Sequence, residues 1–176
     1  MGTFTVDTLD ELLQPKNHED RTFCSVPDLK QHTAEFVQAT LSAIDVELRV
    51  IAMLGQKRAD EYWSMNADHR ERAKVSGDKS QLCYLGTRVR IVGNAVSFEW
   101  YRNRTRPAQE GSDRSQVFST YIKKGKGNRY PDSFFAREPE WAKKLIRETE
   151  DAYEPLRKRV ALLTTLRKRL NEYVRM

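Results

Sequence analysis

The stretch TRVRIVGNAVSFEWY, residues 87–101, decides the fold of this chain. Apolar and polar residues alternate up to Val92, the dipeptide Gly93-Asn94 follows, and the alternation resumes as far as Tyr101. A period of two indicates strands that are buried on one face, and a Gly-Asn pair between two such runs is typical of a tight hairpin turn. The stretch therefore predicts an antiparallel β-hairpin.

The turn also sets the register of the predicted hairpin. Val89 falls opposite Phe98 and Arg88 falls opposite Glu99, which predicts a cross-strand ion pair. One face of the hairpin is apolar, and the other carries Arg88, Arg90, Glu99 and Tyr101. A polar loop over residues 106–115 follows, and residues 116–124 predict a third strand.

Two long amphipathic helices are predicted on either side of this sheet. Apolar residues recur at steps of three and four from about residue 36, continue to about His69, and lose the pattern by Gly77. A second helical region begins near Glu138, and Pro155 either bends it or starts a new helix. We therefore predict an α+β fold with a long N-terminal helix, a three-stranded antiparallel sheet and a long C-terminal helix packed antiparallel to the first.

Charge is distributed unevenly along the 176 residues, whose net charge is +6. Residues 1–28 carry two cations and six acids, whereas residues 81–130 carry ten cations and three acids. We interpret residues 1–26 as an acidic arm and residues 27–176 as a single domain. A basic body of this kind favours a polyanionic partner.

The targeting and redox signals are few. No apolar run is long enough to cross a bilayer, and the N-terminus lacks the pattern of a signal peptide. The two cysteines, Cys24 and Cys83, are too few and too distant for a disulfide framework or zinc knuckle. We expect a cytoplasmic protein with reduced thiols, and with no membrane partner.

Residues 121–131, YIKKGKGNRYP, form the most basic short segment of the chain. Lysine and arginine neutralise phosphate, glycine lets the backbone approach it, and aromatic rings offer faces to bases. We therefore predict a DNA-binding surface made of this loop and a basic sheet face. Its candidate residues are Arg88, Arg90, Tyr101, Arg102, Arg104, Tyr121, Lys123, Lys124, Lys126, Arg129 and Tyr130.

A second basic track is predicted on the C-terminal helix. It consists of two triplets ten residues apart, which is nearly three turns, so they lie roughly on one side of the helix. The triplets are Arg157, Lys158, Arg159 and Arg167, Lys168, Arg169. The alternative is a solvated face beside the leucine seam of the helix.

The residues do not predict catalysis. The histidines His18, His32 and His69 lie far apart, and the acids Glu148, Glu150, Asp151 and Glu154 interleave with cations as on a solvated helix surface. Trp100 and Trp141 are interpreted as core residues. We predict no catalytic residue, no metal site and no cofactor.

Three segments resemble the MobI-like proteins of conjugative plasmids and integrative conjugative elements. They are GTRVRIVGNAVSFEWYR, STYIKKGKGNRYPDSFF and the EWAKKLIRETEDAYEPLRKRVALL helix, and the resemblance spans about Leu85 to Leu170. It implies an auxiliary factor that acts on DNA at the origin of transfer beside a relaxase. It does not imply the nicking enzyme itself, and it supplies no catalytic residues.

The sequence thus favours an accessory factor of conjugative transfer that binds origin-of-transfer DNA, with a relaxase and a second copy of itself as possible partners. Three alternatives stay open: a helical dimerisation or interaction module, a metal-dependent nuclease, and an RNA-binding protein. Salt dependence of binding, metal-dependent cleavage and competition with RNA distinguish them.

Overall fold

The computed structural model of the chain describes residues 6, 10, 26–106 and 116–175. The acidic arm predicted over residues 1–26 and the polar loop predicted over residues 106–115 lie almost entirely outside these ranges, as do His18 and Cys24. Within the described ranges, no helix is both long enough and apolar enough to cross a membrane.

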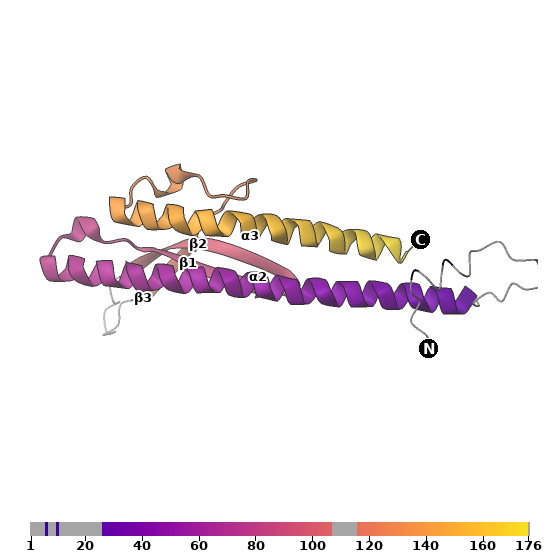
Figure 1. The fold of residues 1–176 in the computed structure, drawn as a ribbon. Helices are drawn as coiled ribbons and strands as arrows, with labels where there is room; N and C mark the ends of the chain where they lie inside the picture. The colour runs from indigo at the N-terminus through magenta and orange to yellow at the C-terminus, as the bar shows by residue number, and fades with distance from the viewer. Residues whose placement is uncertain (1–5, 7–9, 11–25, 107–115, 176) are drawn as a thin grey trace, which may run out of the picture.

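Two long helices run antiparallel to each other along the length of the molecule (Figure 1). Helix α2 spans Val26–Ser76 and helix α3 spans Glu140–Tyr173. Helix α2 runs past the predicted end near His69 because no glycine or proline lies between His69 and Gly77. Pro155 lies inside α3, on its exposed side, and a single helix continues through it.

The sheet has three antiparallel strands in the order β1-β2-β3, and this α+β architecture confirms the predicted fold. The strands are β1 (Leu85–Val92), β2 (Ala95–Arg106) and β3 (Gln116–Tyr121). The predicted register is confirmed, because Val89 pairs with Phe98 and Arg88 pairs with Glu99. Strand β3 ends three residues before the predicted Lys124.

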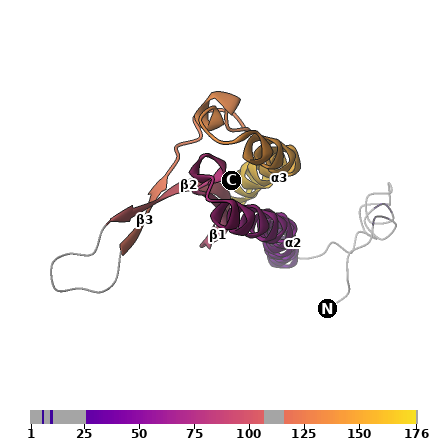
Figure 2. The same cartoon turned by 90° about the vertical axis from the view of Figure 1, so that its left-hand side faces the viewer.

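The apolar face of the sheet rests on the two helices, as predicted. Phe98 and Trp100 lie on this face and are buried. The view along the two helices shows the sheet packed beside the helices (Figure 2). Phe98 belongs to a cluster with Ile51 of α2 and Leu156 of α3. Trp100 belongs to a second cluster whose other members include Tyr62, Leu85, Tyr130, Phe135 and Leu145.

A glycine in α2 makes the close contact between helix and sheet possible. A Cβ atom at Gly55 would lie 2.0 Å from the Cε1 atom of Phe98, which is much closer than two nonbonded carbon atoms approach. The absence of a side chain at Gly55 therefore leaves the space that the ring of Phe98 fills.

Strands β2 and β3 continue beyond the end of β1 as a two-stranded ribbon. Residues 103–106 pair with residues 116–119, whereas β1 pairs only as far as Arg102. Thr105 and Val117 are exposed on one face of this ribbon, and Arg104 and Phe118 are exposed on the other. Strand β3 lies at the edge of the sheet farthest from the helices (Figure 2). The ribbon is thus presented to the surroundings on both faces.

Candidate nucleic-acid interface

The basic loop between β3 and the short helix η3 (Asp132–Phe135) is anchored at both ends. At its start, the backbone N–H of Ile122 donates to the carbonyl of Trp100 at 2.9 Å. At its end, the backbone N–H of Tyr130 donates to Oε2 of Glu150 at 2.9 Å. Gly125 takes a φ of 88°, a conformation that residues with a side chain rarely adopt. The loop is therefore held at its base and bends sharply near its tip.

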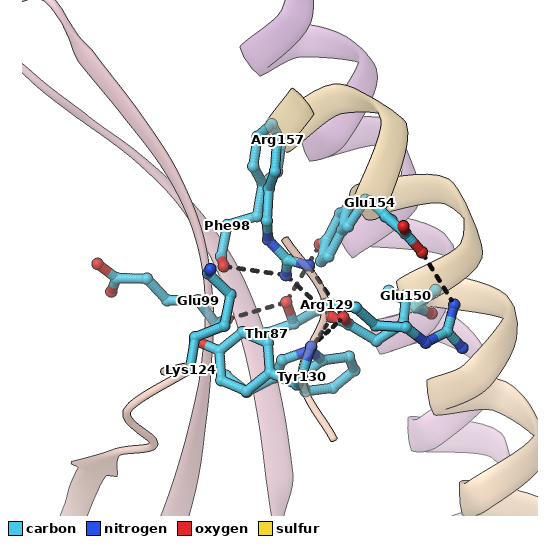
Figure 3. Close-up of polar contacts among 12 residues, drawn as sticks. Thr87, Phe98, Glu99, Lys124, Arg129, Tyr130, Glu150, Glu154 and Arg157 are labelled. Carbon is cyan, nitrogen blue, oxygen red and sulfur yellow. Dashed lines mark hydrogen bonds and ion pairs between the residues drawn. The ribbon is translucent and has the colours of Figure 1, made fainter. Parts of the chain in front are cut away.

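A buried ion pair on α3 supports the end of the loop (Figure 3). Both guanidinium NH groups of Arg157 donate to the carboxylate of Glu150 at 2.9 Å, and the two side chains are almost fully buried. Trp100 Nε1 also donates to Glu150, at 2.6 Å. Arg157 further donates to the carbonyls of Asn128 at 2.9 Å and Phe98 at 3.2 Å. One pair of charges thus links α3, the loop and the central strand.

This pair overturns two interpretations of the sequence. Glu150 is 1% exposed and is not a solvated surface acid, and Arg157 is 7% exposed and is not part of an accessible basic track. The guanidinium of Arg157 also lies over the rings of Tyr130 and Tyr153, at 5.1 and 5.2 Å from their centroids. Charged groups on the apolar side of a helix are buried when each one satisfies the other.

The four cations of the loop have different surroundings. Lys123 and Lys126 are exposed, and no acid in the described part of the chain forms an ion pair with either of them. Lys124 is half-buried and donates to the carbonyl of Gly127. Desolvation and the nearby charge of Arg157 lower the pKa of Lys124, while Glu150 opposes the shift.

Arg129 is turned toward α3 and not toward the tip of the loop. Its guanidinium pairs with Asp151, and it lies 3.6 Å from Glu154. The hydrogen bond to Asp151 is the main factor that raises the pKa of Arg129. Among the predicted loop cations, Lys123 and Lys126 are therefore the ones presented with uncompensated charge.

The outer face of the sheet carries a second group of cations, as predicted. Arg88 Nε donates to Glu99 at 2.9 Å, and Arg90 lies 3.9 Å from the same carboxylate. The Arg88 and Arg90 side chains are nearly half exposed, whereas that of Glu99 is mostly covered. The guanidinium of Arg88 also lies 5.4 Å from the ring centroid of Tyr101. Two arginines thus share one acid, which leaves a net positive charge.

Arg102 and Arg104 lie on the opposite face, which corrects the prediction of one basic sheet face. Arg102 pairs with Leu85 across the ladder and therefore points toward the helices, where it donates to the buried Glu138 at 2.7 Å. Arg104 points the same way but is exposed, because it lies in the ribbon beyond the helices. Both are an even number of residues from Trp100, so strand alternation alone sets their side.

The three predicted tyrosines separate into two environments. Tyr101 and Tyr121 are cross-strand partners on the outer face, and Tyr121 is half exposed. Burial raises the pKa of Tyr101. Tyr130 is 1% exposed and packs in the core, where burial raises its pKa strongly. Tyr130 is therefore a core residue and not a contact residue of the interface, which corrects the prediction.

The cations of the second predicted track form ion pairs with several different acids. Arg159 and Arg167 pair with Glu47 and Asp45 of α2, so they join the two helices. Lys158 lies 2.7 Å from Glu154 on the same helix. Lys168 and Arg169 share Glu172 and are about three-quarters exposed. The two triplets therefore do not form one continuous accessible surface.

A cleft of about 220 Å³ separates the loop from the sheet and α3. Its polar lining comprises Ser97, Glu99, Tyr121, Lys124, Asn128, Tyr130 and Arg157. The cleft connects the anchored loop to the outer face that carries Tyr121 and Glu99. Of these groups Tyr121, Lys124 and Asn128 are at least partly exposed, and they can hold an anion or the edge of a base through hydrogen bonds.

Residues whose structural role was not predicted hold this arrangement together. Glu150 and Arg157 are seven residues apart, two helical turns, on the same side of α3 as Tyr153. Opposite charges at that spacing beside an apolar stripe are the signal that would have identified them. No signal in the sequence identified Glu138 as the partner of Arg102.

The described residues contain no group of three or more His, Cys, Asp or Glu side chains placed to hold a metal ion. His69 is half-buried and stacks on Trp141, with ring centroids 4.1 Å apart. Trp100 is confirmed as a core residue, and Cys83 is buried just before β1.

Comparison with known protein families gives a match over most of the described chain. The model of the MobI protein family matches residues 52–171, which is more than half of the chain. The match begins earlier than the resemblance seen in the sequence and takes in the second half of α2, where Tyr62 packs against Trp100 of the sheet. No curated protein and no solved structure matches the chain.

Proposed function

Because the chain belongs to the MobI family, whose role is in conjugative mobilisation, we propose that it is an accessory factor that binds DNA at the origin of transfer. The observation that carries this proposal is the anchored loop, which presents Lys123 and Lys126 beside the outer sheet face. A rigid base costs less conformational entropy on binding than a free basic tail would.

The interface divides into phosphate-binding and base-reading parts. Lys123 and Lys126 contact phosphates. Arg88 and Arg90, which pair with Glu99 in the free protein, contact phosphate oxygens in its place when DNA binds. Tyr121 offers an exposed ring face next to them. Phosphate contacts determine where the protein lies on the DNA, and the tyrosine adds a contact to a sugar or base.

The protruding ribbon supplies the base contacts. A two-stranded β-ribbon fits the major groove of duplex DNA, where side chains reach the edges of bases. Arg104 is exposed in this ribbon, and Asn103 lies next to it on the other face, where its side-chain oxygen accepts a hydrogen bond from Ser119 at 2.7 Å. Arginine pairs with guanine and asparagine with adenine in such complexes.

The proposed setting is the cytoplasm, with a relaxase as the enzyme that nicks and this protein as the factor that marks the site. The proposal assigns no catalytic residue to this chain. The alternative functions are an interaction module, a metal-dependent nuclease and an RNA-binding protein, and two experiments test them.

The first experiment compares two double variants with the same loss of charge. Fluorescence anisotropy is measured with duplex DNA from the region that flanks the gene, after footprinting has located the protected site. We expect Lys123→Ala with Lys126→Ala to weaken binding at least about tenfold, which corresponds to about 1.4 kcal/mol. The log–log dependence of affinity on salt should become shallower by about two.

Lys168→Ala with Arg169→Ala is the matched control, because these exposed cations on α3 already share Glu172. We expect it to bind within about twofold of the parent, since it removes no proposed contact. Equal weakening by both double variants would show that only total charge matters, and would exclude the loop as the interface. An unchanged affinity in the loop variant would exclude it too.

A second experiment tests the enzymatic and RNA alternatives. The protein is incubated with magnesium or manganese and with supercoiled or end-labelled single-stranded DNA of the same site. We expect binding with neither nicking nor a covalent adduct. A product that one point mutation in this chain abolishes would make the protein a catalyst. RNA of the same length that displaces the DNA at equal concentration would favour the RNA-binding alternative.

A further inference from the structure

Helix α2 carries a second apolar stripe on the side away from the sheet and α3. Its members follow the alternating three- and four-residue spacing of a heptad repeat, at positions 36, 39, 43, 46, 50 and 53. All six are exposed: Phe36, Ala39, Ala43, Val46, Val50 and Met53. Met53 is 72% exposed and Val46 is 61% exposed. We call these six residues the α2 seam.

The α2 seam is separate from the stripe that builds the core. The buried side of α2 contains Val37, Ile44, Leu48 and Ile51. With about 100° between successive residues, the centre of this stripe and the centre of the seam lie about 140° apart around the helix. A surface helix needs one apolar stripe to pack on its own domain, so the seam is available to a further helix.

We propose that the α2 seam joins two copies of this chain in an antiparallel, two-helix coiled coil. Side chains that repeat every seven residues pack as knobs into holes of a partner helix with the same repeat. Over 18 residues the seam is about 26 Å long. The next repeat position in the C-terminal direction is Lys57, where the apolar pattern ends.

The sizes of the seam residues favour the antiparallel orientation. Around a two-fold axis near its middle, Phe36 of one copy faces Met53 of the other, Ala39 faces Val50, and Ala43 faces Val46. Every alanine then meets a valine, so the layers have similar volume. In a parallel dimer each alanine would face an alanine, which leaves two thin layers beside the Phe36 layer.

The charges at the ends of the seam agree with this orientation. Glu35 and Lys57 lie at opposite ends of the seam, and both are exposed. In the antiparallel pair, Lys57 of one copy lies about 4–5 Å along the axis from Glu35 of the other. Two such opposite-charge contacts form, one at each end, whereas a parallel pair would leave these residues far apart. A second copy of this chain is therefore the partner that the surface fits.

The oligomeric state tests this proposal independently of DNA binding. Light scattering after size exclusion should give the parent a mass of twice 20.6 kDa at high concentration, and the mass should fall on dilution. Val46→Glu should be monomeric at the same concentration. At a dilution where the parent is also monomeric, the parent and the variant should show the same melting curve by circular dichroism. Val75→Glu is the matched control, because Val75 is 83% exposed on the same helix but lies outside the seam. It should remain dimeric.

A parent that is monomeric throughout the range would overturn the proposal, as would a Val46→Glu variant that is as dimeric as the parent. Cross-linking tests the orientation in a Cys24→Ser background, where the remaining Cys83 is buried. Oxidation of a mixture of Phe36→Cys and Met53→Cys proteins should give mixed disulfide dimers. Disulfide dimers formed by either protein alone would instead show a parallel pair.

Discussion

At the scale of single residues, Glu150 and Arg157 determine where the basic loop lies. The two charges balance each other. Glu150 also accepts hydrogen bonds from Trp100 and Tyr130, and Arg157 also donates to the carbonyls of Asn128 and Phe98. A buried ion pair often adds little net stability compared with apolar residues of the same size, but the loss of one partner is costly. We infer that the pair is retained because it specifies the position of the loop.

Glu150→Ala tests this role at the level of stability. We expect it to lower the free energy of unfolding by about 3–5 kcal/mol, because it removes the charge that balances the buried Arg157 guanidinium and leaves the Trp100 N–H buried without an acceptor. Urea denaturation monitored by circular dichroism measures the change. Glu148→Ala, two residues away at a half-exposed position, should change it by no more than about 0.5 kcal/mol.

A double variant separates the charge from the packing. Glu150→Met combined with Arg157→Met should be less destabilised than the sum of the two single variants, because no buried charge is left unpaired. Additive losses would mean that the two side chains act independently, and the buried pair would then not be what holds the loop.

At the scale of elements, α2 packs against both α3 and the sheet, and Gly55 marks the point where the ring of Phe98 meets the helix backbone. A glycine in the middle of a helix is unfavourable by its intrinsic propensity. Its presence here shows that the contact with the sheet outweighs the preference of the helix. The element is therefore shaped by its neighbour as well as by its own sequence.

Gly55→Ala sets these two effects against each other. Helix propensity alone would make the variant about 1 kcal/mol more stable. We expect instead a loss of about 1–3 kcal/mol, because the new methyl group overlaps the Phe98 ring and forces the sheet away from the helix. Thermal melting shows whether the variant is more or less stable than the parent. Ser64→Ala, at an exposed position of the same helix, should be neutral or slightly stabilising, whereas a stabilised Gly55→Ala would contradict the packing described here.

At the scale of the whole molecule, the fold buries several groups that lose a proton at alkaline pH. Burial raises the pKa of the Cys83 thiol from 9.0 to about 11 and that of the Tyr153 hydroxyl from 10.0 to about 12. Burial also raises the pKa of Tyr62 well above 10.0. The unfolded chain therefore loses these protons at lower pH than the folded chain does.

The sign of the pH dependence follows from this difference. Between about pH 9 and pH 12 the unfolded state binds fewer protons, so the free energy of unfolding decreases as pH rises. We expect the parent to lose more than about 2 kcal/mol between pH 8 and pH 11, of which Cys83 contributes a large part. Urea titrations at each pH measure it. Cys83→Ala should lose less over this interval, and an equal loss would show that the thiol is not the group responsible.

The two proposals meet at this scale. If two copies join along the α2 seam, their loops and ribbons are related by a two-fold axis. Dimeric DNA-binding proteins with such symmetry read inverted half-sites at a spacing that the dimer sets. A footprint of the parent should then be symmetric, and the Val46→Glu monomer should protect a single half-site with lower affinity.

The local sequence was sufficient for the elements and for much of their pairing. The alternation around Gly93-Asn94 predicted β1, β2 and their register, because the side-chain period of a strand and the length of a turn are local properties. The three- and four-residue spacing predicted both helices for the same reason. The alternation also predicted the outer face with Arg88, Arg90 and Tyr101. The same alternation places Arg102 and Arg104 on the opposite face, which the prediction of one basic sheet face overlooked.

Only the tertiary structure decided which charged and aromatic residues reach the surface. Glu150, Arg157 and Tyr130 belong to residue types that are usually at least partly exposed, and all three are buried because groups distant in the chain satisfy or cover them. Burial depends on what packs against a residue and not on its neighbours in sequence. The same reason left Lys123 and Lys126 as the accessible cations of the loop, since Arg129 is drawn to acids on α3.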